Sequence, residues 1–320
     1  MRAFLLKAYN QPAQLCNLHV QQPAFGEVRL RIAACGLNFA DLLMLEGKYQ
    51  EHPPLPMTLG MEVSGTVEAL GPGVSTPSIG SRVAVFANQG GLATHGCFPA
   101  ARCIPLPDDM PFTDAAAFQI AYGTSHLALD HKARLQPGET LFVTGAAGGV
   151  GLTAVEIGKR MGARVIASAR GADKLALLTA AGADHVIDST ATDLRETLKS
   201  LGGFDVMYDS VGGDAFLDAL RAAKPEGRLL TIGFASGTVP QIPANLLLVK
   251  NLSVMGLYWG GYLNFCPDVL TNSLTTLFNW YQAGGLKPHI SHILPLEQVE
   301  DALDLLRSRK STGKVVVTMD

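Results

Sequence analysis

A glycine-rich segment between an apolar run and a helical run constrains the fold of this chain most strongly. Residues 141–143 (LFV) are followed by residues 144–151 (TGAAGGVG), after which a helix is predicted. Glycines at such a place let the backbone approach a pyrophosphate, which is held by unpaired N–H groups at the helix start. We therefore predict that Gly148, Gly149 and Val150 bind a pyrophosphate, with a plain glycine-rich turn as the alternative.

The segments around this loop alternate between strand-like and helix-like runs. Strands are predicted at 140–144, 164–169, 185–188, 205–210 and 228–233, and helices at 150–161, 172–181, 194–201 and 214–223. Apolar runs that alternate with helices of this length are typical of βαβ units. The fold class is therefore predicted to be α/β, with a Rossmann-type doubly wound parallel sheet. In this setting the glycine-rich loop indicates dinucleotide binding.

The rest of the chain is organised differently. Residues 1 to about 115 contain several short apolar runs separated by glycine and proline, which is typical of a β-rich domain. Beyond about residue 265, a helix, a second helix at 299–307 and a strand at 313–319 no longer continue the βαβ rhythm. We predict a β-rich domain from residues 1–119 and 266–320, and a dinucleotide-binding domain from residues 120–265.

The end of the second predicted strand indicates which dinucleotide is bound. An NAD site carries Asp or Glu about 20 residues after the loop, where it accepts from the ribose hydroxyls. Here the strand ends with Ser168, Ala169 and Arg170, and Lys174 follows. Arg170 and Lys174 are predicted to pair with a 2′-phosphate, and Ser168 to contact the cofactor, so NADPH is favoured. Alternatively, Arg170 is only a solvated turn charge; the nearby Asp173 is interpreted as a helix N-cap.

Composition excludes several classes of partner. The 320 residues carry 25 basic and 28 acidic side chains, a formal net charge of −3, so nucleic acid is not expected as a partner. The first ten residues contain Arg2 and Lys7, which interrupt any apolar core of an export signal, and residues 251–267 are too short an uncharged stretch to span a membrane. We expect a cytoplasmic protein without a membrane segment, whose five cysteines, lacking a C-x-x-C pair, are reduced.

Several segments resemble the zinc-independent quinone oxidoreductases, the zeta-crystallin group of the medium-chain dehydrogenase/reductase superfamily. They are residues 36–41, 60–65, 145–151, 209–213 and 227–234, with 243–251 and 256–260 resembling the quinone-oxidoreductase-like branch. This resemblance implies a β-rich GroES-like catalytic domain beside the Rossmann domain. It also implies a homodimer in which the apolar residues 252–258 pair across the dimer axis; an internal core strand is the alternative.

The resemblance implies no zinc site. The zinc alcohol dehydrogenases of the superfamily bind catalytic zinc through a Cys and a His, and the matching residues here are Asn38 and Met61. Neither is a usual zinc ligand. The four-cysteine lobe that binds structural zinc in those enzymes is also missing, because only Cys97 and Cys103 occur between residues 86 and 104.

The resemblance further implies roles for individual side chains. Asn38 is expected beside the nicotinamide and its ribose, and Tyr49 in the quinone pocket, where its hydroxyl bonds the acceptor. Further cofactor contacts are implied for Thr124, Ser189 and Phe234. Leu43 stands where the family has a second tyrosine. This replacement bears on the expected substrate and not on the expected cofactor. The plainer alternatives are a turn-capping Asn38, a surface Tyr49 and a core Phe234.

Together these features predict an NADPH-dependent, metal-free oxidoreductase that transfers hydride to a quinone. A quinone or a conjugated enone suits metal-free transfer because the anion that forms is delocalised, so a polar group can stabilise it without a Lewis acid. One alternative is an NADPH-dependent alkenal, enone or enoyl-thioester reductase. Another, from a different class, is a non-catalytic NADPH-binding protein, either crystallin-like or RNA-binding.

Overall fold

The computed structural model describes residues 1–190 and 193–319, which divide into two compact units. Unit 1 comprises Met1–Ile120 and the chain from Pro288 on, and unit 2 comprises Ala121–Lys287. The predicted return to the first domain at residue 266 differs from this division. The helix after residue 266 belongs to unit 2 because Ser273 bonds His126 at 2.8 Å, and because the Arg160 guanidinium lies 4.7 Å from the Trp280 ring centroid.

Unit 2 is built on a six-stranded sheet in the order β11-β10-β9-β12-β13-β14. Its strands are β9 (Thr140–Val143), β10 (Arg164–Ala169), β11 (His185–Asp188), β12 (Phe204–Asp209), β13 (Ala223–Thr231) and β14 (Ser253–Gly256). Every neighbouring pair is parallel. The predicted doubly wound parallel sheet is therefore confirmed.

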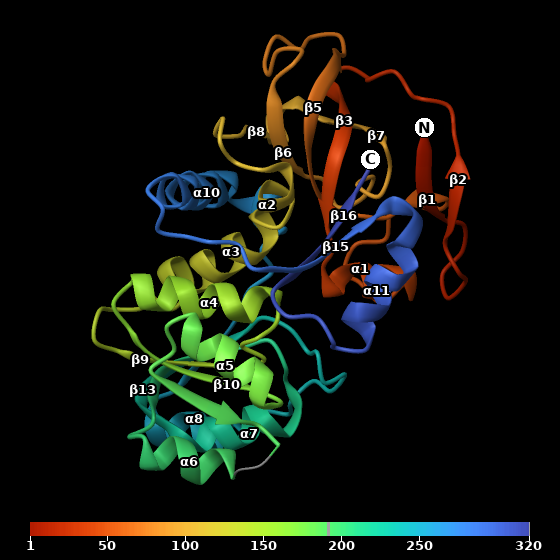
Figure 1. Cartoon of the computed structure of the whole chain (residues 1–320). Helices are drawn as coiled ribbons and strands as arrows, with labels where there is room; N and C mark the ends of the chain where they lie inside the picture. The colour runs from red at the N-terminus through yellow and green to blue at the C-terminus, as the bar shows by residue number, and fades with distance from the viewer. Residues whose placement is uncertain (191–192, 320) are drawn as a thin grey trace. The chain divides into compact units, whose positions relative to one another are not determined.

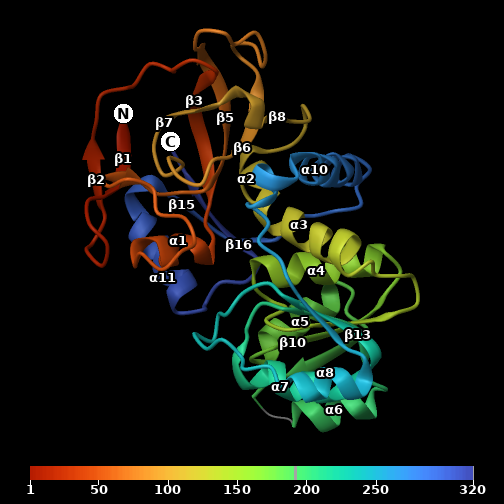
Figure 2. The ribbon, with the colours of Figure 1, turned by 180° about the vertical axis from the view of Figure 1, so that it is seen from behind.

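Helices connect these strands, and Figures 1 and 2 show the unit from its two sides, with α4 and α5 nearer the viewer in Figure 1 and α7 and α8 nearer in Figure 2. They are α3 (Gln119–His126), the π-helical segment Leu127–Lys132, α4 (Gly149–Arg160), α5 (Ala172–Ala180), α6 (Leu194–Ser200), α7 (Gly213–Ala222), α8 (Ala244–Lys250), α9 (Tyr262–Phe265) and α10 (Pro267–Gln282). Large apolar side chains such as Phe142, Phe204 and Phe216 are fully buried between sheet and helices. Burial on both faces explains why the central strands β9 and β12 are mainly apolar.

The strand order indicates where this sheet would bind a ligand, namely at the carboxyl ends of its strands. The chain runs from β9 outward through β10 to β11, and then returns to β12 on the other side of β9. In open parallel sheets, ligands bind outside the carboxyl ends of the strands where the order reverses. That position is the carboxyl ends of β9 and β12, and the glycine-rich loop directly follows β9.

Strand β14 lies at the edge of the sheet and pairs with β13. The alternative interpretation of residues 252–258 as an internal core strand is therefore wrong. The preceding helix α8 exposes Leu248 and Val249 to 79% and 78%. An unpaired strand edge next to apolar side chains is a surface that proteins normally cover.

Unit 1 contains a seven-stranded sheet, β15-β16-β3-β5-β6-β8 with β7 also paired to β3, and a three-stranded sheet, β2-β1-β4. The strands are β1 (Arg2–Leu6), β2 (Gln14–Asn17), β3 (Glu27–Gly36), β4 (Met57–Thr58), β5 (Glu62–Leu70), β6 (Arg82–Phe86), β7 (His95–Pro99), β8 (Cys103–Pro105), β15 (Ile290–Pro295) and β16 (Lys314–Thr318). Apart from the parallel β15–β16 pair, these strands are antiparallel. The predicted β-rich character of this part is confirmed.

Short helices complete unit 1. They are α1 (Phe39–Leu45), α2 (Phe112–Ala116), α11 (Val299–Arg307) and the 3-10 turns Ala100–Arg102 and Leu296–Gln298. The last strand of the chain, β16, lies beside β3 (Figure 1), so residues near both ends of the sequence meet in one sheet. Across the residues that the structure describes, no helix is long and apolar enough to cross a bilayer.

Candidate functional site

The loop between β9 and α4 has the geometry of a phosphate cradle. Gly145 has a φ of +57°, a conformation that favours glycine, and an added Cβ on Gly151 would lie 2.4 Å from the Gly145 carbonyl oxygen. Gly148 is the exposed N-cap residue of α4, and a glycine has no side chain that could accept a hydrogen bond from the first-turn N–H groups. The first-turn N–H groups of α4 are thus without a side-chain cap, as an anion site at a helix start requires.

A buried carboxylate fixes this loop against the loop after β12. The Thr144 hydroxyl donates to Asp209 Oδ1 in a short hydrogen bond, and Asp209 also accepts from the N–H groups of Val211 and Gly212. Burial raises the pKa of Asp209, and these donors oppose the rise. The Ser210 N–H donates back to the Thr144 hydroxyl at 3.2 Å. The two loops at the switch point are therefore held together by a closed set of bonds.

Most of the predicted cofactor residues gather at the carboxyl ends of the parallel strands. Arg170 is exposed directly after β10, Ser189 is exposed directly after β11, and Phe234 is 39% exposed just beyond β13. Phe234 is therefore not the core aromatic residue of the alternative interpretation. Ser168 is buried inside β10, where its hydroxyl donates to the Val143 carbonyl at 3.4 Å.

Lys174 and Asp173 both lie in the first turn of α5, close behind Arg170. The N-cap of α5 is Gly171, with a φ of +90°, so the interpretation of Asp173 as the cap is wrong. Asp173 is instead an acidic residue in a helix first turn, where the helix dipole favours it. Asp173 is therefore not explained as a cap, and it lies in the same segment as the basic residues Arg170 and Lys174.

Thr124 lies on α3, which packs against the start of α4. The hydroxyl of the adjacent Ser125 donates to the Val150 carbonyl at 2.8 Å, and the Thr153 hydroxyl donates to the Ala121 carbonyl at 3.0 Å. Thr124 itself is 7% exposed. These bonds place α3 beside the phosphate loop within unit 2.

In unit 1, three neighbouring strand ends bring Asn38, Glu62 and Lys314 together, and we call these three residues the buried polar cluster. Glu62 begins β5, Lys314 begins β16 and Asn38 follows β3, which lies between those strands. Lys314 Nζ forms a short ion pair with Glu62 Oε1 and donates to Asn38 Oδ1 at 2.8 Å. The Glu62 and Lys314 residues are 0% and 4% exposed. The Glu62–Lys314 ion pair is therefore buried, and both of its members are bonded to the Asn38 amide.

Further bonds anchor this cluster to the backbone. Asn38 Nδ2 donates to Glu62 Oε1 at 3.1 Å and to the Gly36 carbonyl at 3.3 Å. The second oxygen of Glu62 accepts from the Ile120 N–H at 2.9 Å. Asn38 also occupies the N-cap position of α1 and forms a capping box with Asp41, as the alternative interpretation expected. Its amide bonds Glu62 and Lys314 as well.

Asp41 and Cys35 are buried next to the cluster and are electrostatically unusual. Burial raises the pKa of Asp41 from 3.8 to about 7, opposed by the Asn38 N–H, which donates to Asp41 Oδ2 at 2.8 Å. Its other oxygen has no hydrogen-bond partner in the described part of the chain. Burial, and then the negative charges of Asp41 and Glu62, raise the pKa of the Cys35 thiol well above its ordinary value. Cys35 is thus a protonated thiol rather than a nucleophile.

The side chains at this place do not fit a zinc ion. Asn38 and Met61 stand where zinc alcohol dehydrogenases have Cys and His, and the Asn38 amide is already bonded to Glu62 and Lys314. Met61 is buried. Within residues 1–190 and 193–319, no group of three or more His, Cys, Asp and Glu side chains has a metal-binding arrangement.

Tyr49 lies in the loop after α1 and is partly buried. Tyr9 and His52 hold this loop: Gly47 has a φ of +63°, an added Cβ there would lie 2.9 Å from the Tyr9 ring, and His52 Nε2 lies 3.1 Å from the Gly47 carbonyl oxygen. Tyr49 is therefore not a fully exposed surface residue. Leu43, at the position of the missing family tyrosine, lies on α1 and is half-buried.

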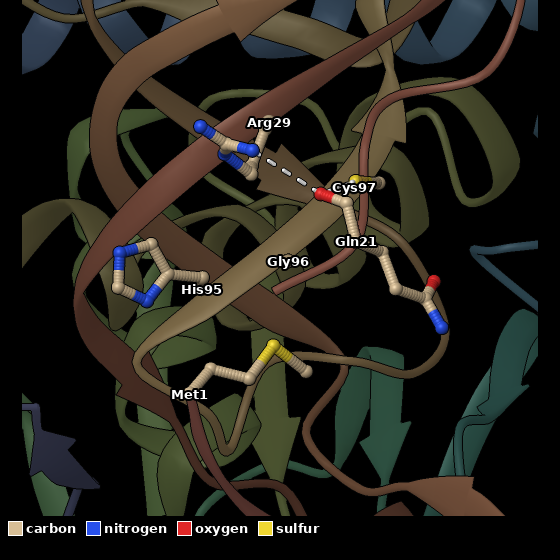
Figure 3. Close-up of a pocket in the computed structure, with 6 residues that line it drawn as sticks. All are labelled: Met1, Gln21, Arg29, His95, Gly96 and Cys97. Atoms are coloured by element: carbon tan, nitrogen blue, oxygen red, sulfur yellow. Dashed lines mark hydrogen bonds between the residues drawn. The ribbon is translucent and has the colours of Figure 1, made fainter. Parts of the chain in front are cut away.

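A small hollow elsewhere in unit 1 carries none of the predicted site residues. Figure 3 shows its lining, formed by Met1, Gln21, Arg29, His95, Gly96 and Cys97. The Arg29 guanidinium donates to the Gln21 carbonyl and pairs with Glu68, and burial raises the pKa of the Cys97 thiol. In this hollow the Arg29 guanidinium is therefore already hydrogen-bonded, and the Cys97 thiol is protonated.

Sequence reasoning missed the charged members of both networks. Glu62, Lys314 and Asp209 lie in segments where these charges were assigned no role, although a signal was present: each is a charge at the first or last position of a mainly apolar strand. A charge buried in such a segment needs a partner, because an unpaired buried charge is strongly unfavourable. The partner, however, is distant in sequence.

The raised pKa of Asp41 predicts a pH-dependent stability. Between about pH 4 and about pH 7 the folded chain holds a proton on Asp41 that the unfolded chain has lost, so the free energy of unfolding should fall as the pH rises through this window. Asp41→Asn keeps an oxygen for the Asn38 N–H and should show a smaller fall. Urea unfolding at several pH values measures this; equal pH dependence in both proteins would contradict it.

Comparisons with known families and proteins agree with this geometry. Residues 24–108 match the alcohol dehydrogenase GroES-like domain family, which confirms the predicted GroES-like domain. Residues 181–317 match the family described as zinc-binding dehydrogenase, in contrast to the donor set found here.

Full-length relatives carry related names. The chain is 39% identical over 322 residues to quinone oxidoreductase-like protein 2 of Mus musculus, covering 99% of this chain and 92% of the relative. It is 34% identical over 313 residues to the synaptic vesicle membrane protein VAT-1 homolog of Homo sapiens, covering 92% of this chain and 79% of the relative.

Solved structures share the fold over nearly the whole chain. The quinone oxidoreductase of Thermus thermophilus, also solved in complex with NADPH, is 34% identical with a TM-score of 0.89 and 100% coverage of both chains. The NADPH complex of the Escherichia coli quinone oxidoreductase is 29% identical with a TM-score of 0.90 and 99% coverage of both. The family resemblance predicted from the motifs is confirmed.

Proposed function

We propose that this chain, which belongs to the quinone oxidoreductase-like proteins of the medium-chain dehydrogenase/reductase superfamily, transfers hydride from NADPH to a quinone without a metal ion. Family membership makes it an oxidoreductase that uses NAD(P)H. The observation that carries the finer proposal is the buried polar cluster: where zinc enzymes hold a metal, a lysine ammonium is bonded to Asn38.

The choice of NADPH rests on the surroundings of β10. Arg170 is exposed at the strand end and Lys174 follows in the first turn of α5, whereas the strand end carries no acid that would accept from a ribose hydroxyl. A 2′-phosphate can form charge-assisted bonds with these two side chains. The α4 N-terminus with Gly148, Gly149 and Val150 would bind the pyrophosphate, with Thr124, Ser168, Ser189 and Phe234 as further contacts.

NADPH supplies the hydride when bound. The chain's own side chains then have to orient the reactants and stabilise the negative charge that develops on the acceptor oxygen. We assign the second task to the Tyr49 hydroxyl, because a neutral donor suffices when the anion is delocalised over a quinone ring. Asn38 contacts the nicotinamide half of the cofactor. Cys35, with its raised pKa, takes no part as a nucleophile.

We also propose a homodimer that forms along the edge strand β14. The exposed Leu248 and Val249 of α8 come shortly before this strand in the chain, and we expect a second copy to pair with the strand and to cover both side chains. All five cysteines are free, which is consistent with a reducing compartment such as the cytoplasm. No nucleic acid partner is proposed.

The proposed substrate class is tested by steady-state oxidation of NADPH against matched acceptors. We expect kcat/KM for benzoquinones and naphthoquinones to exceed that for open-chain enones and enoyl thioesters. A higher kcat/KM for the enones would make the chain an enone reductase instead. Tight NADPH binding without turnover of any acceptor would favour a non-catalytic role.

Replacing Arg170 should change the cofactor preference. Arg170→Ala removes a charged donor to the 2′-phosphate, and such a bond contributes about 1.5–3 kcal/mol, so KM for NADPH should rise roughly ten- to a hundredfold while KM for NADH changes little. The exposed Arg195→Ala on α6 serves as the matched control and should leave both constants unchanged. If Arg170→Ala weakens both cofactors equally, Arg170 does not read the 2′-phosphate.

A further inference from the structure

Asp188 places a carboxylate beside the turn that carries Arg170. In the parallel pair of β10 and β11, Ala169 lies opposite Asp188, and the Ser189 N–H donates to the Ala169 carbonyl at 3.0 Å. The Asp188 carboxylate accepts from the Gly171 N–H in the turn itself. The acid that is missing at the end of β10 is therefore supplied by the end of the neighbouring strand.

This carboxylate is held in place and is ionised. Its Oδ1 accepts from the Thr190 hydroxyl at 2.7 Å and from the Thr190 N–H at 3.0 Å. These two bonds, followed by the bond from Gly171, hold the pKa of Asp188 below its ordinary value. At neutral pH the end of β11 therefore carries a full negative charge.

The charge of Asp188 is not neutralised by the nearby arginine. Arg170 is exposed, and in the described part of the chain it forms no ion pair with Asp188 or with another carboxylate. A guanidinium paired with an acid would have to give up that partner before it could bind an anion. Arg170 is therefore available to a 2′-phosphate, while Asp188 keeps its charge.

Opposite charges therefore act at the place proposed for the 2′-phosphate. Arg170 precedes Gly171, and the Lys174 N–H donates to the Gly171 carbonyl at 3.2 Å, so both basic residues belong to this turn. The Gly171 N–H, a donor at a helix start, is used by Asp188 and not by a ligand. At 0.1 M salt, surface charges interact over about 10 Å, which includes a phosphate bound at this turn.

We propose that Asp188 is a specificity-determining residue of the dinucleotide site, whose negative charge limits the preference for NADPH over NADH. This inference rests on the proposed function. The charge disfavours the 2′-phosphate of NADPH, whereas NADH has a neutral hydroxyl there, from which a carboxylate can accept. Arg170 and Lys174 still attract the phosphate, so Asp188 lowers the preference without reversing it.

Asp188→Asn tests this inference, because it removes the charge and keeps an oxygen for the Thr190 donors. The fluorescence of the reduced nicotinamide gives Kd for NADPH and for NADH, which differ only in the 2′-phosphate. We expect the ratio of the two Kd values to change about threefold in favour of NADPH at about 0.1 M salt. At about 1 M salt, where charges are screened beyond about 3 Å, variant and parent should show the same ratio.

Two further variants separate the charge from the local geometry. Asp188→Glu keeps the charge and should show the parent's ratio. Asp184→Asn is the matched control, because Asp184 precedes the opposite end of β11 and also bonds a backbone group. Its carboxylate accepts from the Val165 N–H at 2.7 Å and pairs with Lys159 at 2.8 Å. This variant should leave the ratio unchanged.

The outcomes that would overturn the inference are specific. They are an unchanged or lower preference for NADPH in Asp188→Asn, an increase that persists at high salt, and an increase that Asp188→Glu shares. Failure of the proposed function looks different, because the parent protein itself would then bind NADPH no more tightly than NADH.

Discussion

Lys314→Met alone is expected to lower the free energy of unfolding by about 3–5 kcal/mol, because it leaves the Glu62 carboxylate buried without its counter-charge. Glu62 is 0% exposed and would keep only the Asn38 amide and the Ile120 N–H as donors. Urea denaturation followed by circular dichroism measures the change.

The control for this prediction removes the charge on both sides. In Glu62→Gln with Lys314→Met neither position of the ion pair carries a charge, so most of the lost stability should return. Lys314→Arg keeps the positive charge and should lie between Lys314→Met and the parent. A loss below about 1 kcal/mol for Lys314→Met would mean that Glu62 is not held as a charged partner of this lysine.

Gly151→Ala is expected to weaken NADPH binding by on the order of a hundredfold, the loss associated with a displacement of about 1 Å at a site. Gly151 lies inside helix α4, where alanine would normally add about 1 kcal/mol of helix stability. Here the new Cβ would lie 2.4 Å from the Gly145 carbonyl oxygen and 2.7 Å from Ala146 Cα. The helix start has to move away from the loop, and the N–H groups move with it.

Gly256→Ala is the matched control, because an added Cβ at the end of β14 meets no atom within 4 Å. It should bind NADPH like the parent. Fluorescence titration of both variants gives the comparison. Unchanged NADPH affinity in Gly151→Ala would show that the close approach of α4 to its loop is not needed for pyrophosphate binding.

The parallel sheet could be predicted from sequence because its signal is local. Strands β10 and β11 and helix α11 have the predicted bounds, since each is an apolar run or an amphipathic helix framed by turn residues. The assignment of α10 to a unit was not accessible in this way. It depends on the contacts of Ser273 and Trp280 with residues more than a hundred positions earlier.

The candidate site shows the same limit. The phosphate loop and Arg170 follow directly from strand ends, so a βαβ pattern locates them. Asn38 and Lys314 are 276 positions apart, and only the pairing of β16 with β3 brings them together. The sequence could indicate that Asn38 replaces a zinc ligand, but not which side chains orient its amide.

Oxidation of NADPH by a quinone in buffer containing a strong chelator, with NADH as the control cofactor, tests metal-free hydride transfer from NADPH most directly. We predict steady quinone reduction that is unaffected by the chelator and faster with NADPH than with NADH. Loss of activity in the chelator, or tight NADPH binding without reduction of any quinone, would contradict the assignment.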